Sequence, residues 1–232
     1  MDSTIDRILL VRHALSVANV DPTVGLSTPD HMIPLVDPDA DEQARAAGEK
    51  LAELAIDPAS VCCWSSSFLR CRQTEAIVMA RAFGVAGGAV NRRESFLLRE
   101  QDFGDWDGLT DAEIEERDPV RWEKRRRAQH TLGIFYFRYP NGESRADVVE
   151  RMSIFIGKIH RSRYPTHVIF LHGVTQRAFR MAWMNRSVEW FEAERNPMNA
   201  SVLLIERDPA TTRWVDRYVH PDPLADGVGP DR

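Results

Sequence analysis

The sequence predicts an α/β fold with three layers, α/β/α, in which helices flank a mixed but mostly parallel sheet. Short apolar runs alternate with longer amphipathic segments along the 232 residues, a pattern typical of this class. Several of the apolar runs are continuous, as expected for strands buried on both faces. No internal repeat or linker divides the chain, so we expect one domain over residues 1–220 and a disordered tail over residues 221–232.

The first half of the chain predicts two strands, each followed by a helix. Residues 7–12 (RILLVR) form a continuous apolar run. Four prolines and a glycine make residues 21–41 an irregular loop. Residues 40–55 are rich in Ala, Glu and Leu and predict an amphipathic helix. Residues 61–65 (VCCWS) predict the second strand, and the serines at its end offer an N-cap for a helix over 68–82.

The second half of the chain repeats this alternation. The clearest repeat is residues 167–173 (HVIFLHG), another apolar run that ends in a histidine and precedes a helix reaching about residue 186. The other elements follow from the same patterns. They are one short strand within 84–99, a helical stretch over 107–130 interrupted at Asp118-Pro119, an aromatic segment and turn over 134–142, a helix over 143–162, and strands at 201–206 and 213–219.

Composition excludes several classes of protein. The chain is 28% charged and 43% hydrophobic, with a net charge of −5, which does not favour a general nucleic-acid partner. No segment approaches 18 apolar residues, and the N-terminus lacks the pattern of a signal peptide, so we expect no membrane span. Cys62, Cys63 and Cys71 form neither a disulfide framework nor a metal-type spacing. These features predict a reducing, cytoplasmic setting and indicate no particular oligomeric state.

Polar side chains follow three of the predicted strands. Arg12 and His13 follow the first strand, Arg70 follows the serines that end the second, and His172 ends a later one. Ligands of open α/β sheets bind at the carboxyl ends of the strands. If these strands are neighbours, two arginines and two histidines converge on one spot, and arginine forks match phosphate oxygens. A neutral imidazole could attack phosphorus there.

A leaving group also needs a proton. The stretch LLREQDFGDWDGLT (97–110) supplies four carboxylates, Glu100, Asp102, Asp105 and Asp107. One of them could protonate the leaving oxygen and then activate water.

Four sequence blocks, in order from residue 8 to residue 177, resemble the histidine phosphatase superfamily, also called the phosphoglycerate mutase-like family. RHALSVAN resembles the opening Arg-His-Gly block with its following Ser and Asn. SSSFLRCRQT, LREQDFGDWDG and FLHGVTQR resemble the later arginine, acid and histidine blocks. PDHMIPL, YPNGES and RNPMNAS are similar to a subgroup of fungal, plant and bacterial phosphatases of this family. Ala14 departs from the usual Gly, and Leu15 stands where mutases often carry Glu.

The resemblance implies a three-layer α/β/α fold and a metal-independent phosphatase with no cofactor and a small-molecule phosphomonoester substrate. It implies that His13 forms a phosphohistidine and that Glu100 is the general acid and base. The implied phosphate-binding residues are Arg12, Ser16, Asn19, Arg70 and His172.

Other interpretations stay open. The same residues could serve a phosphoglycerate mutase, although the Glu-Arg-x-Tyr-Gly version of the acid block is missing. Asp105 and Asp107 approximate the Asp-x-Asp pair of a magnesium-dependent aspartyl phosphatase, and a third possibility is a non-catalytic phosphate-binding module. The basic run 121–130 suits a solvated helix face or an anion site, and the aromatic stretch 134–139 suits core packing or a roof over the active site.

Overall fold

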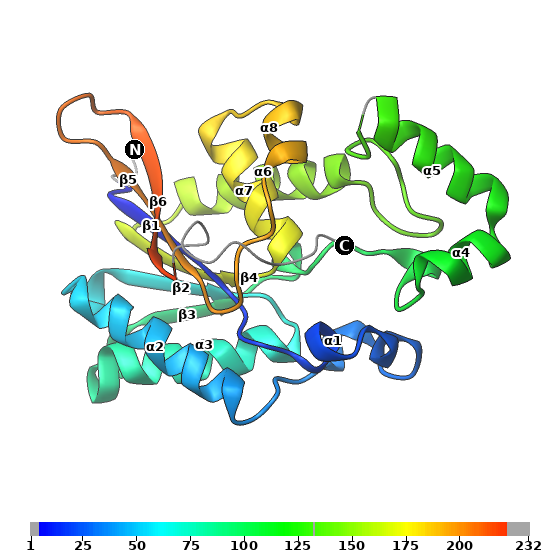
Figure 1. Cartoon of the computed structure of the whole chain (residues 1–232). Helices are drawn as coiled ribbons and strands as arrows, with labels where there is room; N and C mark the ends of the chain where they lie inside the picture. Colours follow the sequence, from blue (N-terminus) through cyan, green and yellow to red (C-terminus); the bar gives the residue numbers. More distant parts are fainter. Residues whose placement is uncertain (1–4, 132, 222–232) are drawn as a thin grey trace.

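The computed structural model describes residues 5–131 and 133–221 (Figure 1). The expected tail therefore lies outside the described residues, apart from Pro221. Among the helices of the described ranges, none is both long and apolar enough to cross a bilayer.

A six-stranded sheet forms the middle layer, in the order β3-β2-β4-β1-β5-β6. The first four strands of this order are parallel to one another, β5 runs antiparallel to β1, and β6 runs antiparallel to β5. This confirms the predicted mixed sheet. The strands are β1 (Arg7–Arg12), β2 (Val61–Ser65), β3 (Asn91–Glu94), β4 (Thr166–Leu171), β5 (Val202–Arg207) and β6 (Trp214–His220).

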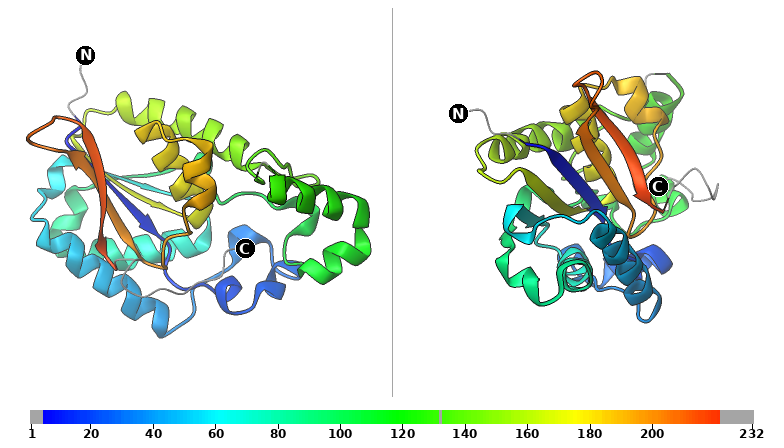
Figure 2. Two further views of the ribbon diagram at one scale, coloured as in Figure 1. Left: turned by 45° about the horizontal axis from the view of Figure 1, so that its top comes forward. Right: turned by 90° about the vertical axis from the view of Figure 1, so that its left-hand side faces the viewer.

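Helices cover both faces of the sheet (Figures 1 and 2). One face carries α2 (Asp39–Glu53) and α3 (Leu69–Phe83), and the other carries α6 (Arg145–His160) and α7 (Gly173–Met184). Successive side chains of a strand point to opposite faces, so each buried strand contributes to both cores. In β1, Ile8 and Leu10 join the core under α6 and α7, whereas Leu9 and Val11 join the core under α2 and α3.

The capping residues and breaks predicted from the sequence match only some of the observed helix ends. The expected interruption at Asp118-Pro119 is confirmed, because it separates α4 (Asp111–Arg117) from α5 (Pro119–Thr131). The helical stretch begins at 111 rather than 107, because Thr110 and Glu113 form a capping box there. The expectation that a serine caps α3 is wrong: its N-cap is Phe68, which makes no side-chain cap bond. Two short helices were not expected, α1 (Val17–Val20) and α8 (Val188–Ala193).

The helices α4 and α5 project from the body of the molecule (Figures 1 and 2). A small core of Trp106, Ile114 and Trp122 joins them to the aromatic segment. The basic run lies on α5, where Arg127 is 78% exposed and pairs with Glu123 on the same helix, as expected for a solvated face.

In the aromatic segment, Phe135 is buried in the main core, and Phe137 and Tyr139 pack against the small core. Tyr136 is exposed. This packing favours the core-packing interpretation.

Candidate active site

The polar residues that follow the strands do converge. β2, β4 and β1 are adjacent and parallel, so their carboxyl ends lie at one edge of the sheet. The ring centroids of His13 and His172 are 5.1 Å apart. A cavity at this edge is lined by six of the predicted site residues: Arg12, His13, Ser16, Asn19, Arg70 and Glu100. His172 is fully buried directly beside it.

A hydrogen bond to the backbone orients the ring of His13. Its Nδ1 lies 2.8 Å from the carbonyl oxygen of Ala14. A carbonyl can only accept, so Nδ1 carries the proton and Nε2 keeps its lone pair. The backbone N–H of Ala14 donates to Thr74 Oγ1 over 2.9 Å. Ala14 does not have a positive φ, so alanine fits where the family usually has glycine.

Burial and nearby cations keep both histidines neutral. Burial lowers the pKa of His13 well below 6.5, and the charges of Arg70 and Arg12 lower it further. Burial likewise lowers the pKa of His172, with Arg70 as the next cause. His172 Nε2 lies 3.0 Å from Ser66 Oγ. A neutral imidazole with a free nitrogen is the reactive form at neutral pH.

The two arginines differ in how they are engaged. Arg12 donates from Nη1 to the carbonyl oxygen of Pro197, and burial lowers its pKa while the charge of Glu100 raises it. Arg70 donates to the backbone carbonyl oxygen and to both carboxylate oxygens of Asp30. Both guanidinium groups lie at the cavity, so together they provide two positive charges for an anion.

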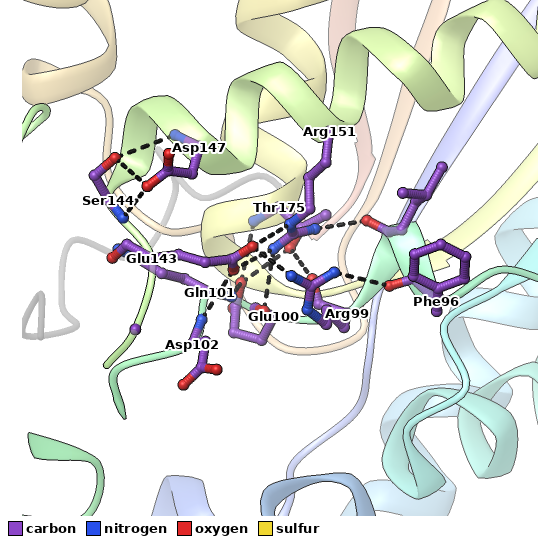
Figure 3. Close-up of polar contacts among 12 residues, drawn as sticks. Phe96, Arg99, Glu100, Gln101, Asp102, Glu143, Ser144, Asp147, Arg151 and Thr175 are labelled. Carbon is purple, nitrogen blue, oxygen red and sulfur yellow. Dashed lines mark hydrogen bonds and ion pairs between the residues drawn. The ribbon is translucent and has the colours of Figure 1, made fainter. Parts of the chain in front are cut away.

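Glu100 meets the N-terminus of α7. Its carboxylate accepts bonds from the backbone N–H groups of Val174 and Thr175, both at 3.2 Å. It also accepts from Thr175 Oγ1 over 3.0 Å (Figure 3). These donors fix the carboxylate at the cavity and next to the loop that carries His172.

The other carboxylates of this stretch divide into two groups. Asp102 accepts from Gly104 N, and Asp105 accepts from the side chain of Asn141, so both are engaged away from the cavity. Asp107 does line the cavity, and burial together with the charge of Asp30 raises its pKa. Asp105 lies within a 3-10 turn, and Asp107 comes directly after that turn. Neither residue follows a buried strand. The aspartyl phosphatase interpretation, which needs such a strand, is therefore wrong.

Ser16 and Asn19 form a small polar unit at the start of α1. Asn19 Oδ1 accepts from the Ser16 backbone N–H at 3.0 Å and from Ser16 Oγ at 2.9 Å. Asn199 Nδ2 donates to the same oxygen over 3.1 Å. Because Oδ1 is the acceptor here, the amide nitrogen is the part of Asn19 that could donate to an anion.

Three residues near the site escaped sequence reasoning. Asp30 and Asn196 line the cavity, and Asn199 also donates to the carbonyl oxygen of His13 over 3.1 Å. A Cβ at Gly173 would lie 2.9 Å from Asn196 Oδ1, so this close approach explains the glycine after the histidine. The motifs PDHMIPL and RNPMNAS mark these loops, but the motifs alone did not indicate a contact.

A buried ion pair holds the segment that carries Glu100 (Figure 3). Arg151, on α6, donates to the carbonyl oxygens of Leu97 at 2.6 Å and Glu100 at 3.1 Å. Its Nε donates to the carboxylate of Glu143 over 3.0 Å. Glu143 in turn accepts from Asp102 N over 3.1 Å. The pair thus holds residues 97–102, the acid segment, against α6 at both of its ends.

Arg151→Met is expected to lower the free energy of unfolding by about 2–4 kcal/mol, because it removes buried charge-assisted hydrogen bonds to Glu143 and to two carbonyl oxygens, while Arg99 still pairs with Glu143 at 2.5 Å. It should also lower kcat, because Glu100 loses the backbone bond that positions it. Urea denaturation and steady-state kinetics measure the two effects. The exposed pair Arg45–Asp41 gives the control Arg45→Met, with an expected loss below about 1 kcal/mol. Equal losses in the two variants would contradict this role of the pair.

Stability is expected to fall on acidification below about pH 6.5. Burial lowers the pKa of His13 and His172, and that of His167 to about 4. In the unfolded chain these imidazoles take up protons near pH 6.5. The unfolded state then binds more protons than the folded state, so the free energy of unfolding decreases as pH falls. His167 alone accounts for about 3 kcal/mol by pH 4. Urea denaturation from pH 8 to 4 measures this, and a flat profile would contradict it.

Comparison with known proteins shows the family of the chain. Residues 8–219 match the family described as histidine phosphatase superfamily (branch 1). Phosphoglycerate mutase-like protein AT74 of Arabidopsis thaliana is 36% identical over 216 residues, which cover 86% of this chain, and the chain spans only 64% of that relative's length. Broad-range acid phosphatase DET1 of Saccharomyces cerevisiae is 35% identical over 132 residues, covering 53% of this chain and 36% of that protein.

Solved structures show the same fold. A mycobacterial glucosyl-3-phosphoglycerate phosphatase in complex with VO3 superposes with a TM-score of 0.70 at 24% identity, covering 92% of this chain and 98% of that one. A putative alpha-ribazole-5'-P phosphatase from Escherichia coli superposes with a TM-score of 0.71 at 18% identity, covering 92% and 95%. With the match over residues 8–219, the chain belongs to the histidine phosphatase superfamily.

Proposed function

We propose that this protein hydrolyses a small-molecule phosphomonoester through a phosphohistidine on His13, with Glu100 as the general acid and base. One observation carries the proposal. His13, whose Nε2 is unprotonated, lines a cavity that is also lined by two arginines and by Glu100. A nucleophile, an anion site and a proton donor are the three parts that phosphoryl transfer to a side chain requires.

In the first step, the lone pair of His13 Nε2 attacks phosphorus and the ester P–O bond breaks. Protonated Glu100 gives its proton to the leaving oxygen, so an alcohol departs. Arg12, Arg70 and the amide nitrogen of Asn19 bind the equatorial phosphoryl oxygens, where negative charge is concentrated. The Nδ1–H of His13 keeps its bond to Ala14, which stabilises the positively charged phosphoimidazole.

In the second step, water attacks the phosphohistidine and the P–N bond breaks. The Glu100 carboxylate takes a proton from the attacking water, and the electron pair of the broken bond returns to Nε2. Orthophosphate then leaves, and the protein is back in its starting protonation state. His172, whose ring centroid lies 5.1 Å from that of His13, is proposed to bind a phosphoryl oxygen, with its ring oriented by the bond to Ser66 Oγ.

Hydrolysis is favoured over phosphoglycerate mutation. Leu15 stands where mutases often carry Glu, and the acid block reads LREQDFGDW. The name of the yeast relative, a broad-range acid phosphatase, also supports hydrolysis. Arg12 and Arg70 supply the positive charge, so we propose that no metal takes part. A cytoplasmic location is a further proposal, supported by three buried free cysteines.

The test is phosphate release from p-nitrophenyl phosphate in EDTA, measured beside isomerisation of 3-phosphoglycerate. Release that persists in EDTA and disappears in His13→Ala supports the proposed phosphatase. Isomerisation without phosphate release would instead identify a mutase. Phosphate binding without either reaction would identify a non-catalytic module.

A further inference from the structure

Arg70 and Asp30 both line the cavity, and the two Nη groups of Arg70 already bind the carboxylate of Asp30. Arg70 Nη1 donates to Asp30 Oδ1 over 2.7 Å, and Nη2 donates to Asp30 Oδ2 over 3.3 Å. The side chain of Arg70 is 6% exposed, so water does not compete strongly for these donors. Carboxylate and phosphate bind a guanidinium in the same two-pronged geometry. The Asp30 carboxylate therefore takes guanidinium donors that a phosphate bound in the cavity could use.

Asp30 can leave this position at low structural cost. It lies in a three-residue 3-10 helix, Asp30–Met32, within the loop that connects α1 to α2, and its side chain is 33% exposed. Its backbone carbonyl oxygen makes a separate bond to Arg70 Nη1, at 2.7 Å. This bond anchors Arg70 whether or not the carboxylate stays. The carboxylate can thus rotate toward solvent while the guanidinium remains at the cavity.

A second carboxylate faces the same space. Asp107 lines the cavity with Asp30, and the charge of Asp30 contributes to the raised pKa of Asp107. Glu100 also lines it. Three acidic side chains thus surround a site with two arginines and two neutral histidines. An anion entering this cavity gains fully from Arg70 only when the negative charge of Asp30 moves away.

We propose that Asp30 is an internal competitor of phosphate at Arg70, displaced when substrate binds and returning when the product leaves. This inference rests on the proposed function and names a residue that sets the affinity of the site for phosphate. The exchange is of one anion for another on the same guanidinium. Competition by the Asp30 carboxylate lowers the affinity of the site for substrate and for orthophosphate alike. Its return to Arg70 promotes release of the product after each turnover.

Asp30→Asn tests this directly, because asparagine keeps the size of the side chain and the backbone carbonyl bond but removes the charge. Titration calorimetry with orthophosphate measures the affinity without requiring turnover. We expect the Kd for orthophosphate to fall by about tenfold, the order of effect of one charge-assisted bond at a partly exposed site. The inhibition constant of orthophosphate and the KM for p-nitrophenyl phosphate should fall in parallel.

A positioning role for Asp30 predicts the opposite sign. If its carboxylate serves only to orient Arg70, then Asp30→Asn raises the Kd, and this outcome overturns the proposal. Asp107→Asn is the matched control, since it removes the same charge from the same cavity without a bond to Arg70, and a smaller gain in affinity is expected. Equal gains in orthophosphate affinity in the two variants would show that Asp30 acts only through its general negative charge, and this outcome would also overturn the proposal.

A double-mutant cycle with Arg70→Met isolates the pair. Without Arg70, the substitution Asp30→Asn should change the Kd by less than about twofold. Thermal unfolding of each variant verifies that it is folded. If the wild-type protein binds no orthophosphate, the proposed function fails. If it binds orthophosphate but Asp30→Asn leaves the Kd unchanged, only the role of Asp30 fails.

Discussion

His13→Ala is expected to reduce turnover by about 10⁴-fold or more, as the loss of a covalent nucleophile does in other enzymes. The imidazole is the only group in the proposed reaction that forms a bond to phosphorus besides water. Its Nε2 is free because Nδ1 donates to Ala14. Phosphate release from p-nitrophenyl phosphate at pH 6 to 7 measures the loss.

The orthophosphate affinity of His13→Ala should change much less than its turnover, since both arginines remain. His130→Ala is the matched control, because this histidine is exposed on α5 and does not line the cavity. Its turnover should equal that of the wild type. Retention of more than about a tenth of the activity by His13→Ala would show that the nucleophile is another group.

Glu100→Gln is expected to lower kcat/KM by about 10²- to 10³-fold for alkyl phosphates, and far less for p-nitrophenyl phosphate. Alkoxides are poor leaving groups and depend on the proton, whereas p-nitrophenolate leaves without it. The parameter kcat/KM reports the steps up to the phosphohistidine, so it isolates the role of the acid. A series of esters with leaving groups of increasing pKa measures the slope.

Two neighbouring carboxylates serve as comparisons. Asp102→Asn should change little, because Asp102 caps a turn away from the cavity. Asp107 lines the cavity and has a raised pKa, with burial as the main cause. If Asp107→Asn steepens the leaving-group dependence and Glu100→Gln does not, Asp107 is the acid. If Glu100→Gln slows both classes of ester equally, Glu100 loses its assignment.

The sequence carried enough information for the sheet and for the centre of the site. Continuous apolar runs such as Leu9–Val11 exist because a central parallel strand contacts a helix layer on both faces. The polar residue that ends such a run lies where the strand ends, so His13 and His172 were expected to meet if their strands were neighbours, and β1 and β4 are indeed adjacent. Arg70 followed from the same logic, because it lies in the first turn of the helix after β2.

Loop contacts could not be derived in this way. Asp30 reaches Arg70 across 40 residues of chain, and Asn196 packs on Gly173 through a loop with no periodic pattern. The acid segment is positioned by another such contact: a Cβ at Gly142 would lie 2.4 Å from the carbonyl oxygen of Asp102. These approaches depend on tertiary packing, which overrides local signals. The same applies to the helix α3, whose start is set by packing of Phe68 rather than by a serine cap.

Trapping the phosphoenzyme tests the central claim most directly. Glu100→Gln should form the intermediate from p-nitrophenyl phosphate and hydrolyse it slowly, giving a burst of p-nitrophenol and an accumulated phosphoprotein. Peptide mass spectrometry after an alkaline quench locates the phosphoryl group. The account predicts a phosphoryl group on His13, stable to alkali and lost in acid. A phosphoryl group on a carboxylate, or turnover without any phosphoprotein or burst, would contradict it.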